Sequence, residues 1–452
     1  MKTMKRNSKR SKKGLVLPLI AAIAICLALL GLGVLQLGFG SRVMSAGVMS
    51  EVSARTAADA GLARALYSMN YAFYNNLPAG SWSLTGSGML DNSLGSNVTY
   101  NYTIEPDPTP ANFGAYLITS TGTAGRENTL GERTERTVYG LTRMTSQFDY
   151  ALFVTNNITM KNTSKVDGYN TNPLTGGGPY GGSNQNLPVQ IGSNTTQPSQ
   201  GTGGQEGIDL KQDVVIIGDI AVGPGAEPYD VITGQGAEGV TGDTYSMGDA
   251  YTWSPIVIPG PAAAMPSINF NHAAQPIGVL GTTTIFECPS VNIGQGGILE
   301  VSGHVRLHVS ANIGSGNVNV GNSAMILIKP ESSLWMYVDG AFDSGQSALF
   351  TQEIPVPLPA NFILYGTGPL NSPVTWTVRN DGDFYGVIYA PNADLVIDAK
   401  GDIYGSISAR SCDLRNSSML HYDIALADPV LFPAGYVIDR WWERIAPVVP
   451  TP

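Results

Sequence analysis

Charged residues are scarce in this sequence. Asp, Glu, Lys and Arg make up 13% of its 452 residues, and the formal net charge is −10. Soluble domains usually contain roughly 25% charged residues. Seven of the basic residues fall within the first 13 positions, so the rest of the chain is more acidic than the total suggests. Because binding to phosphate backbones requires basic surface, this composition excludes a nucleic-acid partner.

Residues that carry chemistry are also few, with three cysteines and four histidines. The sequence has no G-x-S-x-G, H-E-x-x-H, P-loop, G-x-G-x-x-G or C-x-x-C motif. His304 and His308 fall in a strand-like run, where residues four apart lie about 13 Å from each other, too far to share one metal ion. The sequence therefore predicts no catalytic residue, no metal site and no cofactor, and a protein that is not an enzyme.

The cysteines leave disulfide bonding undecided. Cys26 lies in an apolar run near the N-terminus, so Cys288 and Cys412 are the two candidates outside it. An oxidising compartment would allow a bond between them. Their large separation in sequence fixes no geometry, and the pairing stays open.

An uncharged apolar run follows the basic N-terminus. No charged residue occurs from Gly14 to Gly40, and about 20 apolar residues suffice to cross a bilayer as a helix. The basic residues before it hold the N-terminus in the cytoplasm. We expect a basic leader over residues 1–14 and one continuous membrane-spanning and amphipathic helix over 15–76, with the bulk of the chain on the periplasmic or extracellular side. A simple signal anchor is the alternative interpretation.

The second part of this helix carries an apolar stripe at three- and four-residue steps, which is the period of one helix face. Such a stripe either packs on the protein's own globular part or is shared with neighbouring helices in an assembly. The predicted assembly face consists of Val48, Val52, Leu62, Leu66 and Met69.

The remainder of the chain is rich in glycine and in β-type patterns. Period-two alternation over 98–104, 116–121 and 133–141 predicts an antiparallel sheet, within a β-rich head over 77–147. A second region over 148–428 contains a Gly/Asn/Ser-rich loop at 169–207, and a tail follows at 429–452. The predicted fold class is an α+β N-terminal part followed by a mainly-β part.

The second region contains an internal repeat of nineteen residues. A fixed period near twenty, with short strands between glycine turns, is typical of a β-solenoid whose inward apolar residues stack from coil to coil. Equivalent Asp residues, Asp383 with Asp402 and Asp394 with Asp413, would stack as well. They either form turns or line a calcium or acid–base site, and we expect turns. The repeat positions are Gly382, Asp383, Tyr385, Gly386 and Ile388, followed by Gly401, Asp402, Tyr404, Gly405 and Ile407.

Three segments resemble known bacterial families. The Lys12-Lys13-Gly14-Leu15 junction resembles a prepilin peptidase site, and residues 56–66 resemble the A-A-E-A-G-x-x-x-A-L signature of PilX-type minor pilins. Leu19 departs from major pilins, which carry Glu at this fifth mature position. Residues 148–428 resemble a right-handed β-helical domain of unassigned activity. The resemblance implies cleavage between Gly14 and Leu15.

The resemblance also implies a function. It is that of a minor pilin or pseudopilin, a structural subunit of a type IV filament or secretion pseudopilus at the inner membrane. Its partners would be other pilin-like subunits, the inner-membrane assembly machinery and prepilin peptidase. The alternative is a single-pass surface protein whose solenoid binds or cleaves polysaccharide, with Trp253, Trp335 and Trp376 as stacking platforms.

Overall fold

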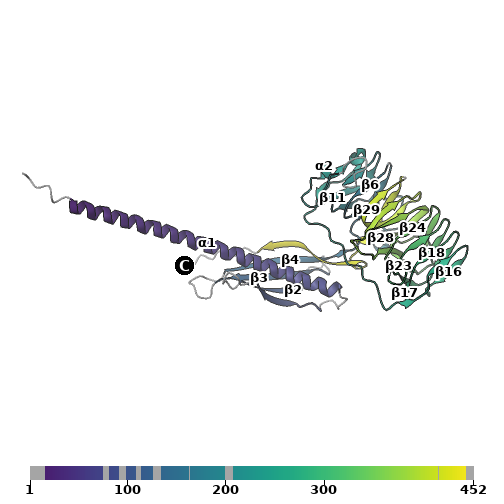
Figure 1. The fold of residues 1–452 in the computed structure, drawn as a ribbon, viewed down its shortest axis with the longest axis horizontal. Coiled ribbons are helices and arrows are strands. Elements are labelled where there is room, and N and C mark those ends of the chain that lie inside the picture. The colour runs from purple at the N-terminus through teal and green to yellow at the C-terminus, as the bar shows by residue number, and fades with distance from the viewer. Residues whose placement is uncertain are drawn as a thin grey trace, which may run out of the picture. The chain divides into compact units, whose positions relative to one another are not determined.

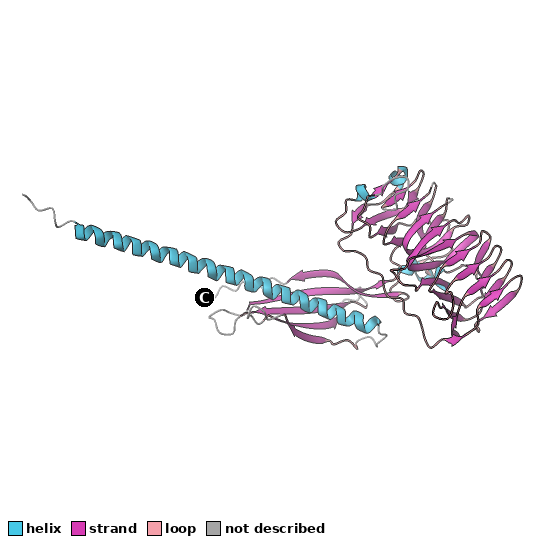
Figure 2. Cartoon of the chain, in the orientation of Figure 1, coloured by secondary structure: helices cyan, strands magenta, loops and turns pink. Residues whose placement is uncertain are grey.

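The computed structural model describes residues 16–74, 81–90, 98–107, 114–125, 134–161, 163–198, 207–415 and 417–443. They form two compact units (Figures 1 and 2). The first unit comprises residues 1–143 together with 436–452, and the second comprises 144–435. The predicted long apolar helix followed by a mostly β chain is confirmed.

The first unit is built on helix α1 (Val16–Tyr74), a single helix of 59 residues. Its N-terminal part is apolar on every side, and its residues from Ile25 to Phe39 are exposed, with Leu35 at 70% and Phe39 at 72%. The helix is long and apolar enough to cross a membrane. About 20 residues would suffice for that crossing, so a substantial part of α1 extends beyond it.

The C-terminal part of α1 packs on an antiparallel sheet. The predicted strands are confirmed as β2 (Thr99–Pro106), β3 (Tyr116–Ala124) and β4 (Thr134–Ser146), and β1 (Thr85–Met89) pairs with β2. Small residues allow close packing. A Cβ added at Gly122 in β3 would lie 1.9 Å from the backbone oxygen of Ala54 in α1.

The predicted tail at 429–452 contains a strand of this sheet. Strand β31 (Pro433–Glu443) lies beside β4, and the strand order is β1-β2-β3-β4-β31. Asn70 of α1 fixes its start, because its side chain accepts a hydrogen bond from the Tyr436 N–H (2.7 Å) and donates one to the Tyr436 carbonyl (2.9 Å). The prediction missed β31 because its partner β4 lies far earlier in the chain, as in the contact of Arg143 with Asp439 across 296 positions.

The second unit is a set of parallel strands in which most strands pair with the third strand after them. The pairings define three stacks. The first stack contains β5 (Leu152–Val154), β8 (Val189–Ser193), β11 (Gly218–Val222), β13 (Thr244–Ser246), β14 (Ala263–Ala264), β17 (Thr283–Cys288), β20 (His304–Val309), β23 (Ser333–Val338) and β26 (Phe362–Gly366).

The second stack contains β6 (Ile158–Met160), β9 (Ile208–Leu210), β12 (Ile232–Thr233), β15 (Ile268–Phe270), β18 (Val291–Ile293), β21 (Val318–Val320), β24 (Phe342–Ser344) and β27 (Val374–Val378). The third contains β7 (Lys165–Tyr169), β10 (Val215–Ile216), β16 (Ala274–Ile277), β19 (Ile298–Val301), β22 (Met325–Ile328), β25 (Ala348–Gln352) and β30 (Met419–Asp423). Two long strands, β28 (Asn380–Ile397) and β29 (Ile403–Leu414), bend from stack to stack.

Short helical turns join some of these strands. They are α2 (Pro228–Val231), η2 (Pro173–Thr175), η3 (Gln235–Gly239), η4 (Pro359–Asn361) and η5 (Ile424–Ala427). Alternating residues of the strands point into one apolar core, as in β20, where Val305, Leu307 and Val309 are buried and the residues between them are not. Val, Ile and Leu suit this pleated, half-buried setting.

The order of the strands along the stacks differs from their order in the chain. The last strands of the unit pair with the first: β29 pairs with β5 and β6, and β30 pairs with β7. In Figure 1, β6 and β11 therefore lie beyond β29, while β16 lies at the opposite end. We call the contact of β29 and β30 with β5, β6 and β7 the seam. The segment 247–262 runs back along the unit, and its Ser254 carbonyl accepts a hydrogen bond from the Tyr389 hydroxyl (2.9 Å).

The described part of the predicted loop 169–207, residues 169–198 and 207, is more ordered than expected. It contains η2 and β8, and Asn184 organises the segment 170–188. The Asn184 side chain donates to the carbonyls of Asn170 (2.9 Å) and Gly178 (2.9 Å) and accepts from the Asn170 N–H (2.9 Å). Polar residues thus build this segment through hydrogen bonds, where the composition alone indicated a linker.

Candidate functional sites

The predicted assembly face of α1 divides into two parts. Leu62 (4% exposed) and Met69 (0%) pack on the unit's own sheet, and Leu66 is half-buried. Val48 and Val52 are each 60% exposed. Together with Leu62 and Met69, the helix buries a stripe of alanines, which consists of Ala54, Ala57, Ala58, Ala65 and Ala72. The predicted cleavage site, Gly14 and Leu15, lies outside the described residues.

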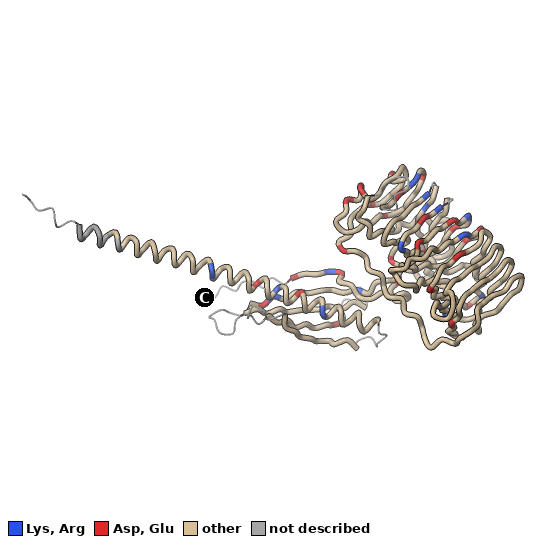
Figure 3. The backbone as a smooth tube through the Cα atoms, viewed as in Figure 1, with Lys and Arg blue, Asp and Glu red and all other residues tan. Residues whose placement is uncertain are grey.

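The helix α1 carries no charged residue before Arg42. Figure 3 shows the described N-terminal part of the helix almost free of charged residues, in contrast to the sheet and the second unit. The first acid is Glu51, which forms an ion pair with Arg136 of β4 (3.0 Å). Arg136 and Arg55 also reach Glu443 of β31, each at 3.8 Å. These partly exposed pairs tie the helix to the sheet beyond the apolar part.

Over part of its length, the nineteen-residue repeat matches the register in which β28 pairs with β29. Tyr385 lies opposite Tyr404 and Ile388 opposite Ile407. The two tyrosine rings stack with centroids 4.3 Å apart and planes at 6°. Gly405 has a φ of +147°, and a Cβ there would lie 1.9 Å from the Gly386 oxygen. This close approach explains why glycine recurs in the repeat.

The predicted stacking of Asp394 on Asp413 is wrong. The register shifts after Ala390, so Asp394 lies opposite Ser411, while Val396 lies opposite Asp413. The shift arises because β28 has three residues at the corner, 391–393, where β29 has one. Asp394 contacts Arg410 and Ser411, and Asp413 forms an ion pair with Arg415 (2.6 Å).

Asp383 and Asp402 do lie close together. Asp383 Oδ1 accepts a hydrogen bond from the Asp402 N–H (3.2 Å), so the two repeat positions are joined across neighbouring coils. Among the residues that the structure describes, no group of three or more His, Cys, Asp or Glu is placed to hold a metal ion. The arrangement of this pair therefore fits a structural role.

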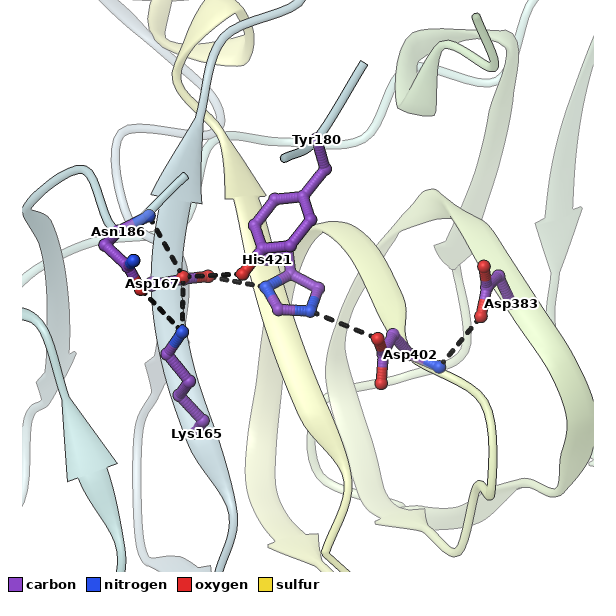
Figure 4. A network of polar contacts seen from close by, with 7 residues as sticks. All are labelled: Lys165, Asp167, Tyr180, Asn186, Asp383, Asp402 and His421. Atoms are coloured by element: carbon purple, nitrogen blue, oxygen red, sulfur yellow. Dashed lines mark hydrogen bonds and ion pairs between the residues drawn. The ribbon is translucent and has the colours of Figure 1, made fainter. Parts of the chain in front are cut away.

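A buried polar network crosses the seam beside this pair (Figure 4). The register places Tyr385, Tyr404, His421 and Asp167 at equivalent positions of β28, β29, β30 and β7. His421 Nδ1 lies 2.5 Å from Asp167 Oδ1, and Nε2 lies 3.4 Å from Asp402 Oδ2. His421 is 1% exposed and Asp167 is 0% exposed. One imidazole thus joins carboxylates on both sides of it.

Asp167 receives further donors from the strand and from the segment 170–188. Its Oδ2 accepts hydrogen bonds from the Tyr180 hydroxyl (2.8 Å) and the Asn186 N–H (3.1 Å), and it lies 2.8 Å from Lys165 Nζ. The Tyr180 ring covers His421, with centroids 4.0 Å apart. Since buried charges are stable only when paired and hydrogen-bonded, this set of donors explains how Asp167 remains in the interior.

The network shifts the pKa values of both buried partners. Burial alone would lower the pKa of His421, but its hydrogen bonds and charge interactions with Asp167 and Asp402 outweigh burial and raise it. Burial alone would raise the pKa of Asp167, but its contacts with His421, Lys165 and Tyr180 lower it. The two shifts widen the pH range in which both groups are charged.

Sequence reasoning did not identify this network. Its two central residues are 254 positions apart, so no local motif joins them. The sequence contains only four histidines, and this scarcity was the one feature that could have drawn attention to His421. Two further members, Tyr180 and Asn186, lie in the segment that the sequence analysis assigned to a loop.

None of the three tryptophans predicted as stacking platforms is fully exposed. Trp376 is 0% exposed and donates a hydrogen bond to the Gly340 carbonyl (3.0 Å), so its predicted role as a platform is wrong. Trp335 is half-buried beneath the Arg306 guanidinium, which lies 3.6 Å from its ring centroid. Trp253 packs edge-on against Tyr389.

The cysteines and the two neighbouring histidines serve the fold. Cys288 and Cys412 are free and buried at inward positions of β17 and β29. His304 Nδ1 lies 3.0 Å from the Ser333 hydroxyl, while His308 Nε2 lies 3.1 Å from Asp339. The two imidazoles therefore have separate partners.

Comparison with known proteins gives limited matches. The model of a family described as a domain of unknown function (DUF7305) matches residues 291–429, which lie within the second unit. No curated protein matches the chain. The chain is similar to the crystal structure of the competence-associated pilin ComZ from Thermus thermophilus. The identity is 12%, covering 87% of this chain and 97% of that one, with a TM-score of 0.25. A likeness at this TM-score supports no conclusion about fold or function.

Proposed function

We propose that this protein is a membrane-anchored structural subunit of the minor pilin or pseudopilin kind, in a type IV filament or a secretion pseudopilus. The observation that carries the proposal is the division of α1 (Val16–Tyr74) within one unbroken helix. Its apolar N-terminal part is exposed, whereas its C-terminal part is packed on the unit's own sheet.

The exposed part of α1 needs an apolar environment. Burying apolar surface is worth roughly 25 cal/mol per Å², and contiguous exposed apolar surface marks a membrane or protein contact. A bilayer supplies that environment before assembly, and the helices of other pilin-like subunits supply it in a filament. Val48 and Val52, exposed on the helix, are then positions for contact with a neighbouring helix. Assembly machinery in the inner membrane and a prepilin peptidase complete the proposed partners.

The second unit is the proposed displayed head, a right-handed β-solenoid without enzymatic activity. Its support is the pairing of strands at a spacing of three and the continuous apolar core. The basic residues before the helix favour a cytoplasmic N-terminus. The head then lies in the periplasm or outside the cell.

Processing of the N-terminus tests the proposal. Protein isolated from the membranes of its native host should begin at Leu15, or its N-methyl form, in N-terminal mass spectrometry. Gly14→Phe should block this cleavage because the peptidase site requires a small residue. Gly31→Ala is the matched control, since a Cβ there has no atom within 4 Å, and it should be processed normally. An intact Met1, or cleavage near Ala46, would contradict the proposal and leave a signal anchor.

A further inference from the structure

An amine, a carboxamide and a buried carboxylate meet at the edge of the seam network (Figure 4). Lys165 Nζ lies 2.6 Å from Asn186 Oδ1 and 2.8 Å from Asp167 Oδ2. The Lys165 side chain is 24% exposed, and the Asp167 side chain is fully buried. The amine is thus held against the amide carbonyl on one side and a potential proton carrier on the other.

The backbone holds the three groups together. Lys165 and Asp167 are two apart in β7, so their side chains lie on the same face of the strand. Asn186 has a φ of +57°, in the left-handed region that asparagine tolerates. Its N–H donates to the same Asp167 oxygen that contacts Lys165. Groups held side by side in this way have a large effective concentration.

We propose that Lys165 and Asn186 become joined by an intramolecular isopeptide bond, with Asp167 as the proton carrier. Asp167 accepts a proton from the Lys165 ammonium, which frees the lone pair of Nζ to attack Asn186 Cγ. The Nζ–Cγ bond forms and the Cγ–Nδ2 bond breaks. Asp167 passes two protons from Nζ, one after the other, to Nδ2, which departs as ammonium. Atoms and charge balance, and no oxidant or other reagent is required.

The residues around Lys165 and Asp167 allow the bond to form, and it needs to form only once in each molecule. The contacts of Asp167 favour its charged form, but a proton needs to cross only the 2.8 Å between Lys165 Nζ and Asp167 Oδ2 to give a neutral amine and a neutral acid. The Tyr180 hydroxyl donates to the same Asp167 oxygen, while the Tyr180 ring covers His421. Since ammonium diffuses away, a rarely populated neutral pair is sufficient. The bond fastens the end of the segment 170–188 to β7.

Tryptic digestion of the full chain, purified in mild detergent and then denatured, tests the bond. The sequence has no Lys or Arg between Lys165 and Lys211, and trypsin does not cleave after an acylated lysine. We expect one peptide spanning 162–211, lighter than its sequence by one ammonia. Two separate peptides of full mass, 162–165 and 166–211, would overturn the proposal. Ammonia loss with normal cleavage after Lys165 would also overturn it, because it indicates a succinimide at Asn186.

Variants separate the roles of the three residues. Lys165→Arg keeps the positive charge but should restore the full mass and cleavage after residue 165, and Asn186→Ala should do the same. Lys329→Arg is the matched control: Lys329 forms ion pairs with Glu300 and Glu353, and the cross-link should persist in this variant. Asp167→Asn should reduce the cross-linked fraction severalfold. An undiminished cross-link in soluble Asp167→Asn protein would refute the role of Asp167.

Discussion

The two units of this protein differ in the exposure of their large apolar side chains. In the first unit, α1 exposes a run of large apolar residues, with Ile25 at 61% and Leu35 at 70% exposed. In the second unit, large apolar residues that point inward, such as Ile388 and Ile407, are fully buried. The first unit therefore needs a bilayer or another helix to cover it, whereas the second is complete in its own core. Contact between subunits is accordingly expected of the helix, not of the core of the stacks.

A charged substitution at each kind of apolar position is the strongest test of this contrast. Ile388→Asp or Ile407→Asp would place an unpaired carboxylate in the core of the second unit, and should destabilise it by several kcal/mol. Val48→Asp, at a position 60% exposed, should leave the melting temperature of both units nearly unchanged. Circular dichroism melting of the full chain in detergent measures these effects.

The same variants distinguish folding from assembly. If the protein is a filament subunit, as proposed, Val48→Asp should reduce its incorporation into filaments in the native host, although the protein folds and reaches the membrane. Ile388→Val is the conservative partner of Ile388→Asp and should cost about 1 kcal/mol. If Ile388→Asp and Ile407→Asp melted like the parent, the inward assignment of both residues would be wrong.

The buried seam should make the second unit more sensitive to pH than the first. The folded pKa of His421 is raised, so its contribution is complete below the unfolded pKa of about 6.5 and is lost as pH rises through the folded value. The folded pKa of Asp167 is lowered, so its contribution is present above its unfolded value and lost as pH falls through the folded one. Stability from this pair should therefore be greatest between about pH 4 and pH 6.5.

Melting curves between pH 5 and pH 9 measure this dependence. The parent should lose a few degrees of melting temperature as pH rises from about 6 to 9, and His421→Gln should melt lower and lose that slope. Removing one partner of a buried pair costs roughly 3–5 kcal/mol. Glu51→Gln is the control from the first unit, because the Glu51–Arg136 pair is partly exposed and should contribute little. If the melting temperatures of the parent and His421→Gln fell equally as pH rises, the seam would be excluded as the source of the pH dependence.

The sequence predicted the parts of this structure that depend on local pattern. Alternation indicated β2, β3 and β4, and the repeat indicated the pairing of Tyr385 with Tyr404. It could not predict that β31 joins the first sheet, or that β30 pairs with β7, because those partners are hundreds of residues apart. The Asp394 error has a different cause: two extra residues at a corner break the period without changing the sequence pattern on either side.

The smallest expected effect concerns the acids of the repeat. If Asp383 and Asp402 are turn residues, Asp383→Asn keeps an oxygen that accepts the Asp402 N–H and should change stability by no more than about 0.5 kcal/mol. Asp394→Asn and Asp413→Asn weaken partly exposed ion pairs, which are worth about 1 kcal/mol or less. Calcium should leave the melting temperature unchanged, since a ligand stabilises a protein only by binding its folded form. A large calcium-dependent shift that Asp383→Asn abolishes would show that this edge of the second unit binds a cation. The second unit would then depend on a bound cation, just as the first depends on a bilayer or another helix, and the contrast between the two units would be weaker.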